Sequence, residues 1–364
     1  MMGGGPAKDT LLAVLPFPEP KDITEHLTQK FPGLDIKWVE VTFSNDTQEL
    51  RKRVLKELWH SATILITFNV IPEPDEVPNL ELIHLVSAGS NQVQNTDIYK
   101  DTKITITTSS GIHGPQIAEW VWLTALVHSH SYNQLYELQK SRVWGSKGAE
   151  YNNVRDWVGR RIGVLGYGSI GRQVGKVARA MGMEVVAFTA TPKDTPEKKK
   201  DHGFIVPGTG DPEGEVPVEW FSGLEKENLH NFLKQDLDWL VVSVPLTEQT
   251  RHFLSKEEFK VLSHDGKRPA FVTNIARGPI IDQPALIEAL KDGTLSGAAL
   301  DVTDPEPLPE DSELWALKNV IVTPHVSGNG VAYTERTFKV LEQNLEHRER
   351  GEPLINVVRR SRGY

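Results

Sequence analysis

The chain has 364 residues, of which 38% are hydrophobic and 24% charged, and its formal net charge is −9. This length exceeds one ordinary core and predicts two domains, while the acidic balance argues against charge-driven binding to nucleic acid or a membrane. The absence of cysteine excludes disulfides, thiol catalysis and cysteine-ligated metal, and we expect no metal site. No apolar run reaches the ~20 residues of a membrane span, and the N-terminus lacks the order of a signal peptide, so we expect a cytoplasmic protein.

Strands and helices alternate in the first 110 residues. Apolar runs predict strands at 11–15, 36–41, 62–67, 82–86 and 104–107, and helical spacing predicts helices at 23–30 and 50–59. This alternation is typical of a parallel sheet, whose ligands bind at the carboxyl ends of the strands. The segment Ser87–Asn91 follows a strand and lies on this candidate binding rim, although an ordinary turn explains it equally well. A single long helix is predicted next, at 115–138.

A glycine-rich turn between two strands dominates the middle of the chain. The strand at 162–165 leads into Gly166-Tyr-Gly168-Ser-Ile-Gly171, and a helical stretch and a second strand at 184–188 follow. In a β-α-β unit of about 30 residues, Gly166 permits the turn, Gly168 admits a pyrophosphate and Gly171 allows close packing. The helix N-terminus favours phosphate as well. The turn alone is also compatible with FAD, S-adenosylmethionine or no ligand.

The remaining elements extend this second sheet. Residues 192–218 are rich in Lys, Asp, Gly and Pro and predict a long surface loop. Strands are predicted at 239–244, 271–275, 297–301 and 320–323, and helices at 229–233, 284–290 and 334–349. The final helix and the tail at 354–358 are expected to pack on the first domain.

Three motifs follow strands of the second domain in order. They are Asn274-Ile-Ala-Arg277-Gly278, then Asp301-Val-Thr-Asp-Pro-Glu306-Pro-Leu308, then Thr323-Pro-His325-Val-Ser-Gly328. With the glycine turn, this series closely resembles the D-isomer-specific 2-hydroxyacid dehydrogenase family, including its glyoxylate and hydroxypyruvate reductases. The resemblance implies two Rossmann-like α/β domains with parallel sheets and an active site in the interdomain cleft. The domains would be a flavodoxin-like substrate-binding domain at 1–124 and 330–364, and a dinucleotide-binding domain at 125–329.

The chemistry that the resemblance implies is the reduction of a 2-keto acid to the D-2-hydroxy acid, and its reverse. Histidine is a natural proton donor near neutral pH, and by resemblance that residue is His325, paired with Glu306. Arginine suits a carboxylate and a carbonyl oxygen, and Arg277 matches that position. The backbone N–H groups of Ala88 and Gly89 would bind the substrate carboxylate.

The expected cofactor contacts come from the glycine turn and from the ends of later strands. They are Gly166, Gly168, Ser169, Ile170, Gly171, Thr189, Thr191, Lys193, Val244, Pro245, Ile275, Ala276, Arg277, Asp301, His325 and Gly328. NAD-binding units of this kind usually place an acid at the end of the second strand, and Thr189 stands there instead. We therefore expect NADP(H) to be preferred and NAD(H) to be possible, unless an acid such as Asp194 reaches this position.

Other interpretations remain open at this stage. Singly, such a His, Glu or Arg is more often a capping, solvated or ion-paired residue, and Asp301 can simply cap its strand. A nicotinamide-sensing corepressor on the same fold is the main alternative to an enzyme, whereas an S-adenosylmethionine enzyme leaves the three motifs unexplained. Phe17 and Trp144 are candidates either for a substrate pocket or for packing. The family typically dimerises, so we expect a homodimer and a small-molecule keto or hydroxy acid as ligand.

Overall fold

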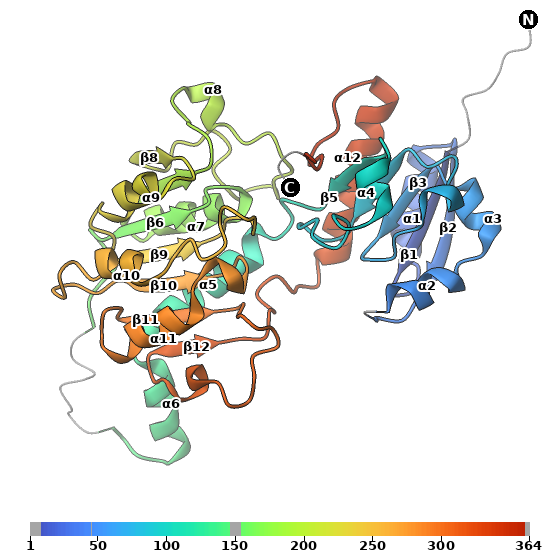
Figure 1. Cartoon of the computed structure of the whole chain (residues 1–364). Coiled ribbons are helices and arrows are strands. Elements are labelled where there is room, and N and C mark those ends of the chain that lie inside the picture. Colours follow the sequence, from blue (N-terminus) through green and yellow to red (C-terminus); the bar gives the residue numbers. More distant parts are fainter. Residues whose placement is uncertain (1–8, 45, 146–153, 361–364) are drawn as a thin grey trace, which may run out of the picture. The chain divides into compact units, whose positions relative to one another are not determined.

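The computed structural model describes residues 9–44, 46–145 and 154–360, which fold into two compact units (Figure 1). The first unit runs up to Ile112 and resumes at Val331, and the second spans His113 to Gly330. The expected domain boundary at residue 124 lies inside a helix, α5 (Gly114–Ser129), that belongs wholly to the second unit. It does so because α5 contacts α7 (Ser169–Ala180) and the neighbouring strands.

The first unit is a five-stranded parallel sheet with helices on both faces. Its order, β2-β1-β3-β4-β5, is the flavodoxin-like doubly wound order. The strands are β1 (Asp9–Leu15), β2 (Leu34–Glu40), β3 (Ile64–Thr67), β4 (Leu82–Leu85) and β5 (Thr105–Thr108). The helices are α1 (Lys21–Lys30), α2 (Thr47–Arg53), α3 (Lys56–Ser61), η1 (Pro74–Glu76), α4 (Asp97–Asp101) and α12 (Tyr333–Arg350).

Alternation along β1 divides the core of the first unit between the two faces of the sheet. Leu12 and Val14 pack with residues of α2 and α3, whereas Leu11 and Leu15 pack with α1 and α12. The C-terminal helix α12 therefore completes the core of the first unit. After it, Val357 forms a single antiparallel bridge with Thr107.

The second unit is a seven-stranded parallel sheet of order β12-β11-β10-β9-β6-β7-β8. Its strands are β6 (Arg161–Leu165), β7 (Glu184–Thr189), β8 (Glu219–Ser222), β9 (Trp239–Val242), β10 (Phe271–Asn274), β11 (Gly297–Leu300) and β12 (Val320–Val322). Besides α5 and α7 it contains α6 (Tyr132–Lys140), α8 (Pro196–Lys199), α9 (Lys226–Leu233), α10 (Lys256–Leu262), η3 (Gly278–Ile280), α11 (Gln283–Lys291) and η4 (Glu313–Ala316). This is a Rossmann order, with the strand sequence reversing at β6 and β9. The predicted α/β class with two parallel sheets is confirmed.

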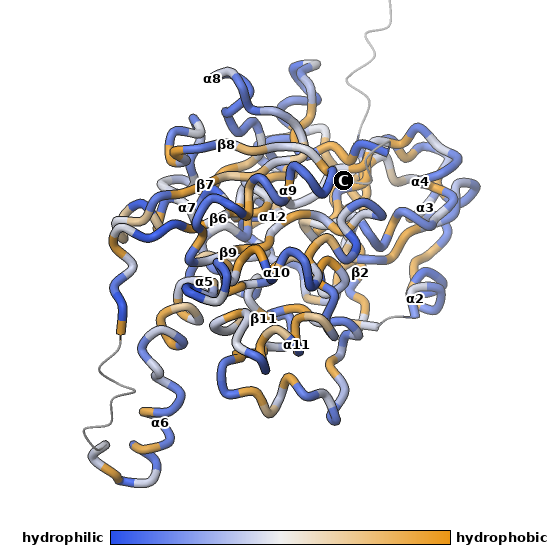
Figure 2. The backbone as a smooth tube through the Cα atoms, turned by 60° about the vertical axis from the view of Figure 1, so that its left-hand side comes forward, coloured by the Kyte–Doolittle hydropathy of each residue, from blue (hydrophilic) through white to orange (hydrophobic). Residues whose placement is uncertain are grey.

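Two predicted helices are each broken into two, and the single-helix predictions were wrong. The backbone leaves the helical conformation and becomes extended at Val54 and Leu55, between α2 and α3. Ser131 adopts a left-handed conformation with φ of 53° between α5 and α6. Neither break has a proline or glycine to mark it, so periodicity alone runs through both. In Figures 1 and 2, α6 extends away from the rest of its unit and carries hydrophobic positions among polar ones.

The predicted surface loop at 192–218 is fastened to α7. Arg172, on α7, donates to the carbonyl oxygens of Lys199 and Asp211, each at 2.5 Å. The Tyr167 hydroxyl bonds to the Asp211 carboxylate at 3.0 Å, and that carboxylate also accepts the N–H groups of Glu215 and Val216. The segment is therefore built against the helix that follows the glycine turn.

Within the described part of the chain, no helix combines the length and the apolar character that crossing a bilayer requires.

Candidate active site

The glycine turn joins β6 to α7 at the carboxyl edge of the second sheet. Gly166 has φ of 104°, and a Cβ there would lie 2.7 Å from the Ser243 carbonyl group. A Cβ on Gly171 would lie 2.4 Å from the Gly166 oxygen, so both positions require glycine. A Cβ on Gly168 would meet nothing within 4 Å, so the backbone before Ser169 and Ile170 faces open space. This cradle at the N-terminus of a 12-residue helix fits a pyrophosphate.

The end of β7 carries hydroxyl and cationic groups. The strand end itself has no carboxylate. The Thr189 hydroxyl donates to the Thr191 carbonyl oxygen at 2.8 Å, and Asp194 is ion-paired with Lys198 at 2.8 Å. Lys193 is half-buried and has no ion pair with the described residues. Burial lowers the pKa of Lys193, and the Arg172 guanidinium lowers it further, whereas Asp201 acts in the opposite direction.

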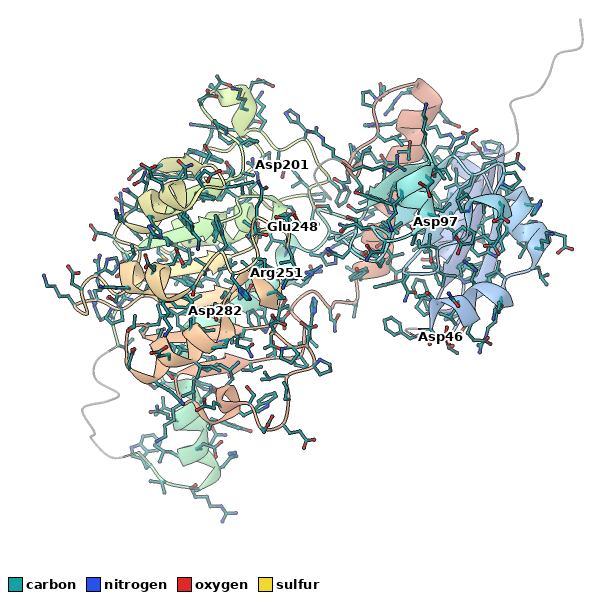
Figure 3. The ribbon with its side chains drawn as sticks, in the orientation of Figure 1. Asp46, Asp97, Asp201, Glu248, Arg251 and Asp282 are labelled. Carbon is teal, nitrogen blue, oxygen red and sulfur yellow. The ribbon has the colours of Figure 1, made fainter. Side chains whose placement is uncertain are left out.

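A second acid of the following segment is Asp201, which is labelled in Figure 3. Its carboxylate lies 3.6 Å from Arg172 Nε, and the Asp201 side chain is mostly buried. Arg172 is itself almost fully buried and is also held over the Tyr167 ring. The end of β7 thus presents two threonines and a lysine, while Asp194 is engaged by Lys198 and Asp201 by Arg172.

A clamp around Asn274 shapes the turn after β10. Asn274 Oδ1 accepts the Ala276 N–H at 3.0 Å, and Asn274 Nδ2 donates to the Arg277 carbonyl oxygen at 3.1 Å. Ile275 and Ala276 are buried within this turn. A Cβ on residue 278 would lie 1.8 Å from the Thr303 carbonyl oxygen, so the position after Arg277 admits only glycine. The strand-end asparagine and this glycine fix where the arginine emerges.

The Asp301 carboxylate organises the turn that carries His325. Asp301 is 1% exposed and accepts hydrogen bonds from the Thr323 hydroxyl at 2.5 Å and from the N–H groups of Val326 and Ser327, each at 2.9 Å. The His325 N–H donates to the Asp301 carbonyl oxygen at 2.8 Å, and His325 has a left-handed φ of 54°. These bonds hold an unfavourable backbone conformation at a histidine. A contact of Asp301 with the cofactor stays a prediction.

His325, Glu306 and Arg277 are brought together by three different strand ends. His325 Nδ1 lies 2.7 Å from Glu306 Oε1, and both side chains are almost half exposed. Among the described residues, none forms a hydrogen bond with the other ring nitrogen, Nε2. Burial lowers the pKa of the Arg277 guanidinium, and the Glu306 carboxylate acts on it in the opposite direction. A histidine oriented by a carboxylate beside a half-buried arginine can deliver a proton next to a bound anion.

The remaining predicted contacts of the second unit border these groups. Val244 and Pro245 follow β9, and the Pro245 carbonyl oxygen accepts the Thr250 hydroxyl at 2.7 Å. The Gly328 carbonyl oxygen accepts Gln116 Nε2 at 3.1 Å, which ties the end of the histidine motif to α5. No group of three or more acidic or histidine side chains in the described segments is arranged to hold a metal ion.

The first unit has its own polar turn after β4. The Ser87 hydroxyl donates to the Gly89 carbonyl oxygen at 2.7 Å and accepts Gln92 Nε2 at 2.7 Å. Ala88 is exposed, and the described residues supply no acceptor to the N–H of Ala88 or Gly89. Of the two aromatic candidates, Phe17 packs against Trp38 with 5.8 Å between ring centroids, whereas Trp144 is fully exposed.

Comparison with known proteins assigns the family. The model of the D-isomer specific 2-hydroxyacid dehydrogenase, NAD binding domain, matches residues 122–207 and 211–327, more than half of the chain. The chain belongs to the D-isomer-specific 2-hydroxyacid dehydrogenase family, a family of oxidoreductases, and the resemblance inferred from its motifs is confirmed. Its second unit is an NAD-binding domain, and its cofactor is a nicotinamide dinucleotide.

Individual relatives cover nearly the whole chain. A glyoxylate reductase from Thermococcus onnurineus is 28% identical over 348 residues, which is 92% of this chain and 95% of the relative. A D-isomer specific 2-hydroxyacid dehydrogenase from Xanthobacter autotrophicus Py2, solved with NADPH and MES, is 27% identical with a TM-score of 0.73, covering 98% and 100%. A probable 2-hydroxyacid dehydrogenase from Rhizobium etli CFN 42, solved with NADP, HEPES and L(+)-tartaric acid, is 25% identical with a TM-score of 0.71 over the same shares.

Sequence reasoning missed several groups that build the site. Ser243 Oγ donates to the Gly166 carbonyl oxygen at 2.7 Å, and Asn274 and Arg172 hold the turns that follow β10 and β7. Ser243 and Asn274 are polar residues at the ends of apolar strands, which is a usable signal. Arg172 had no such signal in the sequence, because its partners are backbone atoms some 27 to 39 residues away.

Proposed function

We propose that the protein reduces a 2-keto acid to the D-2-hydroxy acid, with His325 as the proton donor to the carbonyl oxygen. Bound reduced nicotinamide supplies the hydride that the C2 carbon accepts. The observation that carries the proposal is the 2.7 Å contact between His325 Nδ1 and Glu306, which leaves Nε2 for the substrate. Glu306 holds the ring orientation and stabilises the imidazolium before the proton is transferred, and the reverse reaction returns the proton to Nε2.

The substrate's negative charge needs fixed donors. Arg277 offers a planar fork for the carboxylate and the carbonyl oxygen, and its half-buried position strengthens these bonds. The N–H groups of Ala88 and Gly89 are the proposed donors from the first unit. Both sets of donors must reach one substrate for the reaction to proceed.

For the cofactor, the end of β7 supports a preference for NADP(H). Thr189 brings no carboxylate that would repel a 2′-phosphate, and Asp194 is engaged by Lys198. Thr191 and the half-buried Lys193 are available as donors to that phosphate. Thr189→Asp should therefore shift the ratio of kcat/KM values towards NADH by about tenfold or more. An unchanged ratio would refute the assignment of this strand end.

A homodimer is the proposed assembly. Leu123 on α5 and Leu135 and Tyr136 on α6 are exposed hydrophobic residues, and Trp144 beyond them is fully exposed. An apolar surface of this kind on an extended arm fits a second copy of the chain. Sedimentation equilibrium should give a dimer for the native chain and a monomer for Leu135→Asp.

The test of the enzyme class is the loss of reduced-nicotinamide absorbance with a panel of 2-keto acids, run with NADPH and NADH in parallel. Turnover with a D-hydroxy acid as product is expected. Tight cofactor binding without turnover of any keto acid would contradict the proposal and favour a nicotinamide-sensing protein.

A further inference from the structure

Two phenylalanines meet at the carboxyl edge of the first unit's sheet. Phe43 follows β2 and Phe68 follows β3, and their ring centroids are 5.8 Å apart at an interplanar angle of 66°. Phe68 is half-buried and packs on the core that includes Leu11 and Ile66. The Phe43 ring packs against the Phe68 ring, and Phe43 is 77% exposed. The pair therefore presents a preformed apolar surface, in which packing of Phe68 on the core fixes the position of the rings.

Hydrogen bonds tie this aromatic pair to the turn proposed to bind the substrate carboxylate. Asn69 Nδ2 donates to the Ser44 carbonyl oxygen at 3.2 Å, joining the segments of the two rings. Gln92 Nε2 donates both to the Phe68 carbonyl oxygen at 3.0 Å and to the Ser87 hydroxyl at 2.7 Å. A single amide nitrogen thus bridges the aromatic pair and the turn of Ala88 and Gly89. A ligand held by that turn has an apolar surface beside it.

The segments that carry the two rings lead into acidic residues, which disfavour an acidic side chain on the ligand. Arg51 on α2 is ion-paired with Glu73 and lies 3.5 Å from Glu76. Asp46, labelled in Figure 3, caps α2 by accepting the Glu49 N–H at 3.0 Å. The Arg51 guanidinium is therefore paired with carboxylates. A second carboxylate on the substrate would meet repulsion here.

We propose that Phe43 and Phe68 form the subsite for the substrate's side chain, and that the preferred substrate is a 2-keto acid with an apolar branched or aromatic side chain. Glyoxylate has only hydrogen at that place and would leave both rings exposed. This inference rests on the proposed function, because it assumes that the turn of Ala88 and Gly89 binds the keto acid's carboxylate.

The test compares kcat/KM for phenylpyruvate, 4-methyl-2-oxopentanoate and glyoxylate with the full-length protein and its preferred cofactor. The variants are Phe43→Ala and, as a control, Leu55→Ala, which removes a side chain of the same unit that is 65% exposed. The native protein should favour the two apolar acids over glyoxylate by about tenfold or more. Phe43→Ala should remove most of that advantage and leave glyoxylate within about twofold, and Leu55→Ala should change none of the three values.

Two results would overturn the inference. The first is a native protein that prefers glyoxylate over both apolar acids. The second is an equal loss for all three substrates in Phe43→Ala, which would assign the ring to holding the loop instead of the substrate. If the native protein turns over no keto acid at all, the proposed function fails, and that outcome is separate from a wrong substrate preference.

Discussion

Replacing Asp301 with asparagine tests whether this carboxylate holds the histidine turn. Asp301 accepts three hydrogen bonds and is almost fully buried. Asparagine keeps one acceptor oxygen, and its NH2 group replaces the other carboxylate oxygen. That NH2 group then faces either the Ser327 N–H or the two donors at the other oxygen, which are the Thr323 hydroxyl and the Val326 N–H. Loss of charge-assisted bonds and one unsatisfied buried donor should cost about 2–4 kcal/mol of unfolding free energy. Because the turn carries His325, kcat should also fall by about tenfold or more.

The assay combines urea unfolding, cofactor binding followed by tryptophan fluorescence, and steady-state kinetics. The control is Asp238→Asn, since Asp238 is another buried carboxylate and accepts the Arg161 N–H at the amino edge of the sheet. Both variants should lose stability, but only Asp301→Asn should lose kcat. A large rise in the cofactor's Kd with kcat and stability unchanged would refute this reasoning and assign Asp301 to cofactor binding.

Two further predictions concern the pairing of His325 and two other histidines, the buried His84 and the partly buried His128. Glu306→Gln keeps an acceptor for the ring but removes its charge, so kcat should fall by about tenfold or more with little change in KM, and equal changes in both would argue against a role in proton transfer. Burial lowers the pKa of His84 to about 3 and that of His128 to about 4. The unfolded chain takes up these protons near pH 6.5 and the folded chain only at lower pH, so stability should fall between pH 7 and 5, by about 2 kcal/mol for each histidine at pH 5. Urea unfolding at the two pH values measures this, and a flat profile in that range would contradict it.

The sequence predicted those parts of the site that depend on local backbone geometry. The glycine turn could be assigned because Gly166 and Gly171 stand where no side chain fits, a requirement that leaves a motif in the sequence. The strand ends followed from short apolar runs that stop at polar residues such as Asn274. Parallel strands ending at one edge predicted that Glu306 and His325, 19 residues apart, lie at the same edge of the sheet, whereas their pairing was an implication of the family resemblance.

The features that escaped prediction depend on distant partners. The break between α5 and α6 at Ser131 has no proline or glycine, and only the backbone conformation reveals it. The segment 192–218 is held by Arg172 and Tyr167, whose partners are backbone atoms and a carboxylate far along the chain. The pairing of Phe43 with Phe68 joins two loops that follow different strands, and neither loop has a motif.

The most direct test of the proposed mechanism is the kcat of His325→Ala measured beside that of His26→Ala. His26 is a matched control, since it is an exposed histidine whose Nε2 lies 3.1 Å from the Glu342 carboxylate. We predict that His325→Ala lowers kcat for the best keto acid by about 10²-fold or more while its cofactor Kd stays unchanged, and that His26→Ala matches the native protein. A His325→Ala variant with nearly native kcat would contradict the assignment of His325 as the proton donor.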